Sequence, residues 1–221
     1  MKPLRIALTK GRLENKAVDL FSRIGYDCSA VREKGRKLIL PMGDSIELVL
    51  AKAADVITYV EYGVCDLGVV GKDTILEKGG SYYEVLDLGF GKCRFALAGP
   101  KEAADFFSGY SVKTVATKYP RFAANYFENK AMDVRIIKIE GSVELAPLLG
   151  LSDAIVDLVE TGTTLKENGL RVIEPICEVS ARLIVNAASM KLRKAEIETL
   201  TGRMERCVRK SSSNGKEKSA C

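Results

Sequence analysis

Strand-like and helix-like segments alternate along most of this chain. Short apolar runs such as Leu4–Thr9, Asp66–Val70 and Ala154–Val159 are typical of buried strands, and segments with helical patterning follow them. Parallel strands need a long crossover connection, which is usually a helix. The alternation therefore predicts an α/β fold with largely parallel sheets.

The same signals predict the remaining elements. Further strands are expected at 37–40, 46–50, 93–98, 112–117, 134–139, 170–176 and 181–186, and helices at 14–24, 54–62, 73–78, 121–129, 142–149 and 189–210. Pro41–Asp44 is expected to form a turn. The composition of residues 211–221 is typical of a disordered segment.

Composition excludes several classes of protein. With 221 residues, the chain can bury a core as one domain or as two small lobes. No apolar run approaches the roughly 20 residues that span a bilayer, and the N-terminal residues do not resemble a signal peptide. We therefore expect a cytoplasmic protein that does not enter the membrane.

Six cysteines and no histidine limit the chemistry. The cysteines form no paired metal-binding spacing, and without histidine both Cys/His zinc sites and Ser-His catalysis are excluded. Of the net charge of +5, residues 203–218 carry +4 through six basic and two acidic residues. Because the rest of the chain is nearly neutral, we expect no nucleic-acid partner.

The segment from Glu144 to Leu165 reads ELAPLLGLSDAIVDLVETGTTL and carries the strongest functional signal. It contains the acids Asp157 and Glu160 and the loop residues Thr161, Gly162, Thr163 and Thr164. Hydroxyls and N–H groups at a glycine-containing helix start can donate to phosphate oxygens. Carboxylates accept hydrogen bonds from sugar hydroxyls or bind the water molecules of Mg²⁺. The pattern predicts a phosphoribosyl site, although a strand, a tight turn and a capped helix would have the same local sequence.

Other candidate residues follow predicted strands or begin helices. The candidate cations for an anionic leaving group are Lys10, Arg12, Arg36 and Lys52, and the candidates for a nucleotide site are Gly11, Asp66, Gly68, Gly71 and Asp73. Ser142 and Glu144 are expected at a capped helix start that faces the phosphoribosyl site. For each set a structural role is the alternative. The basic residues could be solvated, the glycines could serve strand packing, and Asp73 could be a helix N-cap.

The longer pattern resembles the signature of the ATP phosphoribosyltransferase family. Its positions are filled here by Glu144, Gly150, Ser152, Ile155, Asp157, Leu158, Thr161, Gly162, Thr164 and Leu165. The opening LRIALTKGRL and the segments DVITYVEYGVCDLGVVGKDT, ATKYP and RLIVN are also similar to this family. The resemblance implies a two-lobed fold of the type II periplasmic-binding-protein kind with a ligand cleft between the lobes. Lobe one would comprise residues 1–92 and 177–221, and lobe two residues 93–176.

The resemblance also implies a reaction. ATP and phosphoribosyl pyrophosphate (PRPP) would give N1-phosphoribosyl-ATP and pyrophosphate with Mg²⁺ present, which is the first step of histidine biosynthesis. The chain resembles the short form of the family, which implies a homodimer within a hetero-oligomer that contains a regulatory subunit similar to histidyl-tRNA synthetase. The family usually has arginine where Lys52 stands, so this position departs from the pattern.

Two alternative functions remain open at this point. A non-catalytic two-lobed protein that binds a small molecule would have the same fold, because function depends on the site rather than on the fold. Another PRPP-dependent transferase would use a similar acid and T-G-x-T arrangement.

Overall fold

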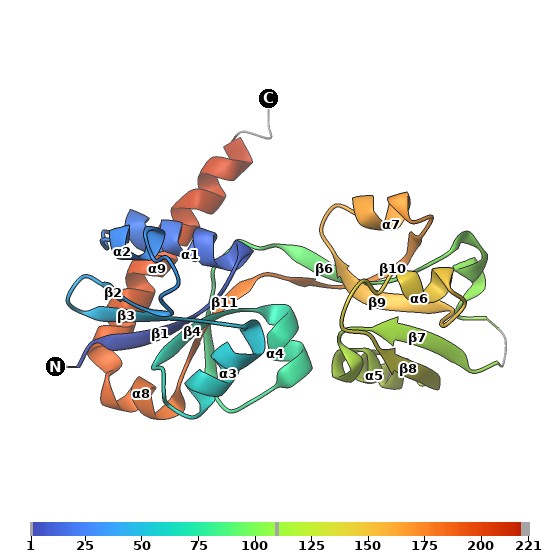
Figure 1. Cartoon of the computed structure of the whole chain (residues 1–221), viewed down its shortest axis with the longest axis horizontal. Helices are drawn as coiled ribbons and strands as arrows, with labels where there is room; N and C mark the ends of the chain where they lie inside the picture. Colours follow the sequence, from blue (N-terminus) through green and yellow to red (C-terminus); the bar gives the residue numbers. More distant parts are fainter. Residues whose placement is uncertain (1, 109–110, 218–221) are drawn as a thin grey trace. The chain divides into compact units, whose positions relative to one another are not determined.

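The computed structural model describes residues 2–108 and 111–217, which form two compact units (Figure 1). Unit 1 contains the residues up to Gly91 and those from Ser180 onward, and unit 2 is Lys92–Val179. The chain therefore passes between the units twice. The crossings lie one and three residues from the lobe limits that the sequence predicts.

Unit 1 is built on a six-stranded sheet with the order β2-β3-β1-β4-β11-β5. Its strands are β1 (Leu4–Thr9), β2 (Ile39–Met42), β3 (Ile46–Ala51), β4 (Leu67–Gly71), β5 (Tyr83–Asp87) and β11 (Ala181–Val185). Its helices are α1 (Arg12–Arg23), α2 (Ser29–Arg32), α3 (Ala53–Glu61), α4 (Lys72–Lys78), α8 (Ala187–Leu192) and α9 (Lys194–Glu217).

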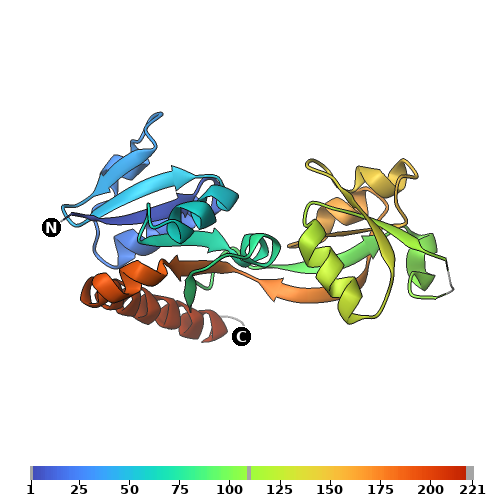
Figure 2. The same ribbon diagram turned by 90° about the horizontal axis from the view of Figure 1, so that it is seen from below.

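Helices cover both faces of this sheet. Because side chains alternate along a strand, Ile6 faces one core and Ala7 faces the other. Ile6 shares its core with Phe21 of α1 and Met204 of α9. Ala7 lies in the second core, to which α3 contributes. Figure 2 shows the red-orange C-terminal helices along one side of the unit, consistent with a three-layer α/β/α arrangement.

Unit 2 is built on a five-stranded sheet with the order β10-β6-β9-β7-β8. Its elements are β6 (Cys93–Gly99), the 3-10 helix η1 (Lys101–Asp105), β7 (Lys113–Thr117), α5 (Pro120–Asn129), β8 (Val134–Lys138), α6 (Leu145–Leu148), β9 (Ala154–Val159), α7 (Thr163–Glu167) and β10 (Arg171–Val179). On one face Phe95 of β6 stacks on Phe122 of α5 with ring centroids 3.9 Å apart. On the other face Val159 of β9 packs with Ala146 of α6 and Leu165 of α7.

Several expectations hold and others need correction. The strands expected at Leu4–Thr9 and Ala154–Val159 are confirmed, and so is the two-unit α/β fold. The expectation of largely parallel sheets is wrong. β1 pairs in parallel with β3 and β4, and β7 with β8 and β9, but the other pairings are antiparallel. Strands β6, β10 and β11, which flank the two crossings, pair only antiparallel and therefore make both sheets mixed.

Local corrections concern three segments. Pro41 lies in β2 rather than in a turn, which is possible because β2 is an edge strand. The expected helix 189–210 is instead two helices that meet at Arg193. Helix α9 continues to Glu217 through residues expected to be disordered, since each added residue of a formed helix gains a hydrogen bond. The rest of that segment, 218–221, lies outside the described residues. No helix in the described ranges is long and apolar enough to cross a membrane.

Candidate functional site

Two of the candidate cations, Lys10 and Lys52, directly follow the carboxyl ends of neighbouring parallel strands. Thr9 of β1 pairs with Ala51 of β3, and the Lys10 N–H donates to the Ala51 carbonyl at 2.9 Å. Lys52 follows directly and is the N-cap residue of α3, so Lys10 and Lys52 are neighbours at this edge. Both are exposed. Ligands of α/β proteins collect at this edge of a parallel sheet.

Gly11 forms the turn between β1 and α1. Its φ of 94° lies in the region that favours glycine. The Glu14 carboxylate accepts a hydrogen bond from the Gly11 N–H at 3.3 Å and forms an ion pair with Lys34. Glu14 is only 5% exposed, so this pair holds the turn from inside the unit. Neither Glu14 nor Lys34 was expected at the site from the sequence, although an acid at the third helical position is a known signal of a helix start.

Gly71 is the last residue of β4, the strand next to β1, and Asp73 lies in the first turn of α4. A Cβ at Gly71 would contact the Asp73 carboxylate, so a side chain there would require the carboxylate to move. Asp73 is the second residue of α4 and not its N-cap, which is Gly71, so the cap interpretation of Asp73 is wrong. Arg12 is the first residue of α1. Arg36 is exposed on the loop between α2 and β2.

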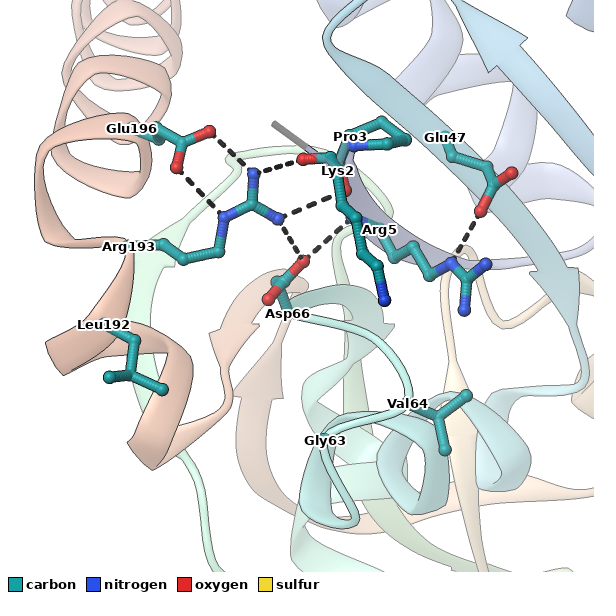
Figure 3. Close-up of a pocket in the computed structure, with 10 residues that line it drawn as sticks. All are labelled: Lys2, Pro3, Arg5, Glu47, Gly63, Val64, Asp66, Leu192, Arg193 and Glu196. Carbon is teal, nitrogen blue, oxygen red and sulfur yellow. Dashed lines mark hydrogen bonds and ion pairs between the residues drawn. The ribbon is translucent and has the colours of Figure 1, made fainter.

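Asp66 lies at the opposite end of β4, away from the candidate residues at the carboxyl edge of the sheet. It accepts hydrogen bonds from the Arg5 N–H at 3.0 Å, the Ser189 hydroxyl at 2.7 Å and Arg193 at 3.1 Å. Figure 3 shows Arg193 between Asp66 and Glu196 at the edge of a cavity of about 760 Å³. Asp66 and Gly71 are five residue steps apart along the strand, or about 16 Å at about 3.3 Å per residue. The two residues therefore do not contact one small ligand together.

Gly68 is a packing residue in the middle of β4. A Cβ there would lie 2.8 Å from side-chain atoms of both Val56 and Val60 of α3. The glycine therefore lets α3 approach the sheet. Of the five residues expected at a nucleotide site, the structure leaves Gly11, Gly71 and Asp73 at the carboxyl edge and removes Asp66 and Gly68 from it.

In unit 2 the loop after β9 has the geometry that the sequence predicts. Gly162 has a φ of 81° and is the N-cap residue of α7. The Thr161 hydroxyl lies 3.0 Å from the Thr163 hydroxyl and accepts the Thr163 N–H at 3.4 Å. Thr161, Thr163 and Thr164 are exposed, and the first N–H groups of a helix have no acceptor within it. The loop can therefore offer several donors to an anion, and Glu160 at its start is also exposed.

Asp157 lies on β9 beneath this loop, on the face covered by α6 and α7. Burial raises the pKa of Asp157 to about 6, and the Glu144 carboxylate acts in the same direction. The Leu158 N–H, which bonds the carboxylate, and the Lys118 ammonium oppose this effect. Lys118 follows β7, which pairs in parallel with β9, and no local sequence pattern marks it as a site residue. Asp157, Glu144 and Lys118 therefore form one electrostatic group.

Ser142 and Glu144 precede α6 as expected, but the helix is shorter than predicted. Glu144 is the N-cap residue, and no side chain caps α6 by a hydrogen bond. The expectation of a capped helix start is therefore wrong. The Glu144 side chain is half-buried and acts on Asp157, whereas Ser142 is exposed.

Comparison with known proteins identifies the family. The sequence profile of ATP phosphoribosyltransferase matches residues 52–206. The chain belongs to the ATP phosphoribosyltransferase family. The ATP phosphoribosyltransferase of Clostridium kluyveri is 60% identical over 205 residues, which cover 92% of this chain and 93% of that protein.

Solved structures support the assignment to ATP phosphoribosyltransferase. The ATP phosphoribosyl transferase (HisG:HisZ) complex from Thermotoga maritima contains a chain that is 33% identical, with a TM-score of 0.80 and coverage of 93% of this chain and 98% of that one. The periplasmic aliphatic sulphonate binding protein SsuA from Escherichia coli is 14% identical, with a TM-score of 0.59 and coverage of 98% and 72%. This second likeness concerns the fold alone and confirms the periplasmic-binding-protein-like architecture.

Proposed function

We propose that this protein transfers the phosphoribosyl group of PRPP to N1 of the adenine of ATP and releases pyrophosphate, as the first step of histidine biosynthesis. The observation that carries the proposal is the loop Thr161–Thr164 with Asp157 beneath it, in a chain of the ATP phosphoribosyltransferase family. The activity of the named relatives supports the same reaction here.

Each residue group has a proposed role. The ribose 5-phosphate of PRPP binds the donors of Thr161, Gly162, Thr163 and Thr164, while Ser142, Glu144, Asp157 and Glu160 surround the sugar. Lys10, Arg12, Arg36 and Lys52 supply positive charge for the departing pyrophosphate, and Gly11, Gly71 and Asp73 contact ATP. Adenine N1 has a free lone pair, so its attack on the anomeric carbon needs no general base. Orientation and electrostatic stabilisation account for the rate enhancement.

We further propose that Mg²⁺ acts with the substrates. No group of three or more Cys, Asp or Glu side chains in the described ranges could hold a metal ion. This supports a Mg²⁺ that arrives on the phosphates of PRPP or ATP, where it would neutralise the charge of the leaving group. Asp157 and Glu160 would then accept hydrogen bonds from its water molecules or from the ribose hydroxyls.

The assembly and location are also proposals. The Thermotoga maritima complex contains HisZ, which supports a hetero-oligomer in which dimers of this chain bind a regulatory subunit similar to histidyl-tRNA synthetase. Five cysteines in the described ranges are free thiols, which supports a reducing compartment and hence the cytoplasm.

The direct test combines ATP, PRPP and Mg²⁺ and follows the absorbance of N1-alkylated adenine, with and without the regulatory subunit. Thr164→Ala and Asp157→Ala should lower kcat/KM for PRPP by about 100-fold, a magnitude typical of the loss of a positioned group. Thr199→Ala, on the exposed side of α9, is the matched control and should retain activity. PRPP binding without product in both assemblies would favour a non-catalytic binding protein. Transfer to another acceptor would favour a different PRPP-dependent transferase.

A further inference from the structure

Arg94 of β6 lies on the same face of the unit 2 sheet as Asp157. In the antiparallel pairing of β6 with β9, Arg94 is opposite Val159 and Ala96 is opposite Asp157. Directly opposed residues of an antiparallel pair point to the same face. Ala96 and Val159 belong to the core under α6 and α7, whereas Phe95 packs on α5 at the other face. Arg94 is therefore on the face of the proposed phosphoribosyl site.

The register also places Arg94 near the T-G-T-T loop. Val159, its partner, is the last residue of β9, so Glu160 and the loop follow from that point. Asp157 is a diagonal neighbour of Arg94, a separation of roughly 7–8 Å that long side chains can bridge. The loop therefore begins next to the strand position of Arg94. On the other side of β6, the exposed Glu178 of β10 is directly opposite Arg94, but the buried Arg94 Nε does not bond it.

The Arg94 guanidinium has a buried donor without an acceptor in the described ranges, unlike the guanidinium groups of Arg5 and Arg193. Its Nε is buried and has no hydrogen-bond acceptor among the described residues. By contrast, the Arg193 guanidinium bonds Asp66 and Glu196, and the Arg5 Nε bonds Glu47 at 2.6 Å. A buried charged donor without an acceptor is unfavourable, and a bound anion would supply the missing acceptor.

A phosphate has the geometry to bind the guanidinium of Arg94. Guanidinium binds phosphate through two parallel N–H···O bonds, and these charge-assisted bonds are stronger than neutral ones. The loop Thr161–Thr164 offers only neutral donors to a dianion, because the threonines and the backbone carry no charge. A cation from the neighbouring strand would complete the set.

We propose that Arg94 binds the 5-phosphate of the ribose of PRPP, together with the Thr161–Thr164 loop. This inference rests on the proposed function, since it assigns a further ligand to the same substrate. Arg94 would bind the phosphate that stays on the sugar rather than the pyrophosphate that leaves.

Isothermal titration of the full-length protein with ribose 5-phosphate, inorganic pyrophosphate and PRPP tests the proposal. Arg94→Gln should weaken the binding of ribose 5-phosphate and of PRPP by at least about tenfold, in line with the loss of one charge-assisted contact. It should leave the binding of pyrophosphate unchanged. Arg94→Lys keeps the positive charge but loses the two parallel N–H donors of the guanidinium. Its loss of affinity for ribose 5-phosphate and PRPP should therefore be intermediate. Arg135→Gln, an exposed arginine of β8 in the same unit, is the matched control and should bind all three ligands normally.

Thermal unfolding without ligand separates binding from a structural role. Because the buried Nε has no partner, Arg94→Gln should unfold at or above the wild-type temperature. A lower unfolding temperature together with equal losses for all three ligands would overturn the proposal. If Arg94→Gln does not fold, unchanged ribose 5-phosphate affinity in Arg94→Lys would overturn it instead.

Comparison with Thr164→Ala distinguishes the failure of this inference from failure of the proposed function. If Thr164→Ala loses ribose 5-phosphate binding while Arg94→Gln retains it, only the role of Arg94 is refuted. If the wild-type protein binds neither ribose 5-phosphate nor PRPP, the proposed function and the role of Arg94 are refuted together.

Discussion

Replacing Asp157 by asparagine should stabilise this protein while it damages the site. Burial raises the pKa of Asp157 from its ordinary value of 3.8 to about 6. Each tenfold change in proton affinity corresponds to about 1.4 kcal/mol, so the ionised carboxylate destabilises the folded state by about 3 kcal/mol. Asparagine has nearly the same shape and carries no charge. Asp157→Asn should therefore raise the free energy of unfolding by about 3 kcal/mol at pH 7–8.

The sign of the pH dependence follows from the raised pKa. Between pH 4 and pH 6 the folded protein holds this proton more tightly than the unfolded chain does. The carboxyl therefore loses its contribution to stability as the pH rises through this interval. The difference between Asp157→Asn and wild type should be near zero at pH 4, grow up to about pH 6 and stay constant above it.

Urea unfolding at a series of pH values measures this difference, and the absorbance assay measures activity in parallel. The matched control is Asp133→Asn, an exposed aspartate of the same unit, which should change neither quantity. The expected combination is a more stable protein with kcat/KM for PRPP reduced by about 100-fold, because the amide cannot accept from the ribose hydroxyls as the carboxylate does. The claim that burial of the ionised Asp157 destabilises the protein would be refuted by a variant that is no more stable than wild type at pH 8. A gain in the free energy of unfolding that does not change with pH would refute it as well.

The remaining predictions concern Gly162, Glu14 and Gly68, with Gly169 and Gly141 as matched controls. Gly162→Ala and Gly169→Ala should each destabilise the protein by about 1 kcal/mol because both residues have positive φ, yet only Gly162→Ala should weaken PRPP binding in titrations. Glu14→Gln should lower the free energy of unfolding by about 2 kcal/mol in urea and reduce kcat, since it breaks the ion pair between the buried Glu14 and the half-buried Lys34 behind the turn at the carboxyl edge; unchanged stability would contradict this. Gly68→Ala should destabilise by about 1–3 kcal/mol through its clash with α3, without changing the KM for ATP, whereas Gly141→Ala meets no neighbour and should be neutral.

Local sequence patterns predicted the elements that bury apolar runs and end at strong breakers. β1 and β9 have the predicted limits because each is a largely apolar segment followed by a polar loop. β5 (Tyr83–Asp87) was not predicted, because its residues are half-buried or exposed and it is a strand only through its pairing with β11. Pro41 predicted a turn because its tolerance in an edge strand depends on the strand order of the sheet.

For the site, the sequence determined the chemistry of each loop but not which side chains meet. The order of acids, glycine and threonines from Asp157 to Thr164 predicts a glycine turn with exposed hydroxyls after a strand, because the positive φ of Gly162 and the exposure of the threonines are local properties. Only the tertiary structure placed Arg94 opposite Val159, because strand register is a long-range pairing that no local pattern encodes. The same long-range contacts bound Asp66 to Arg193 and packed α3 over Gly68, and so removed both residues from the candidate nucleotide site.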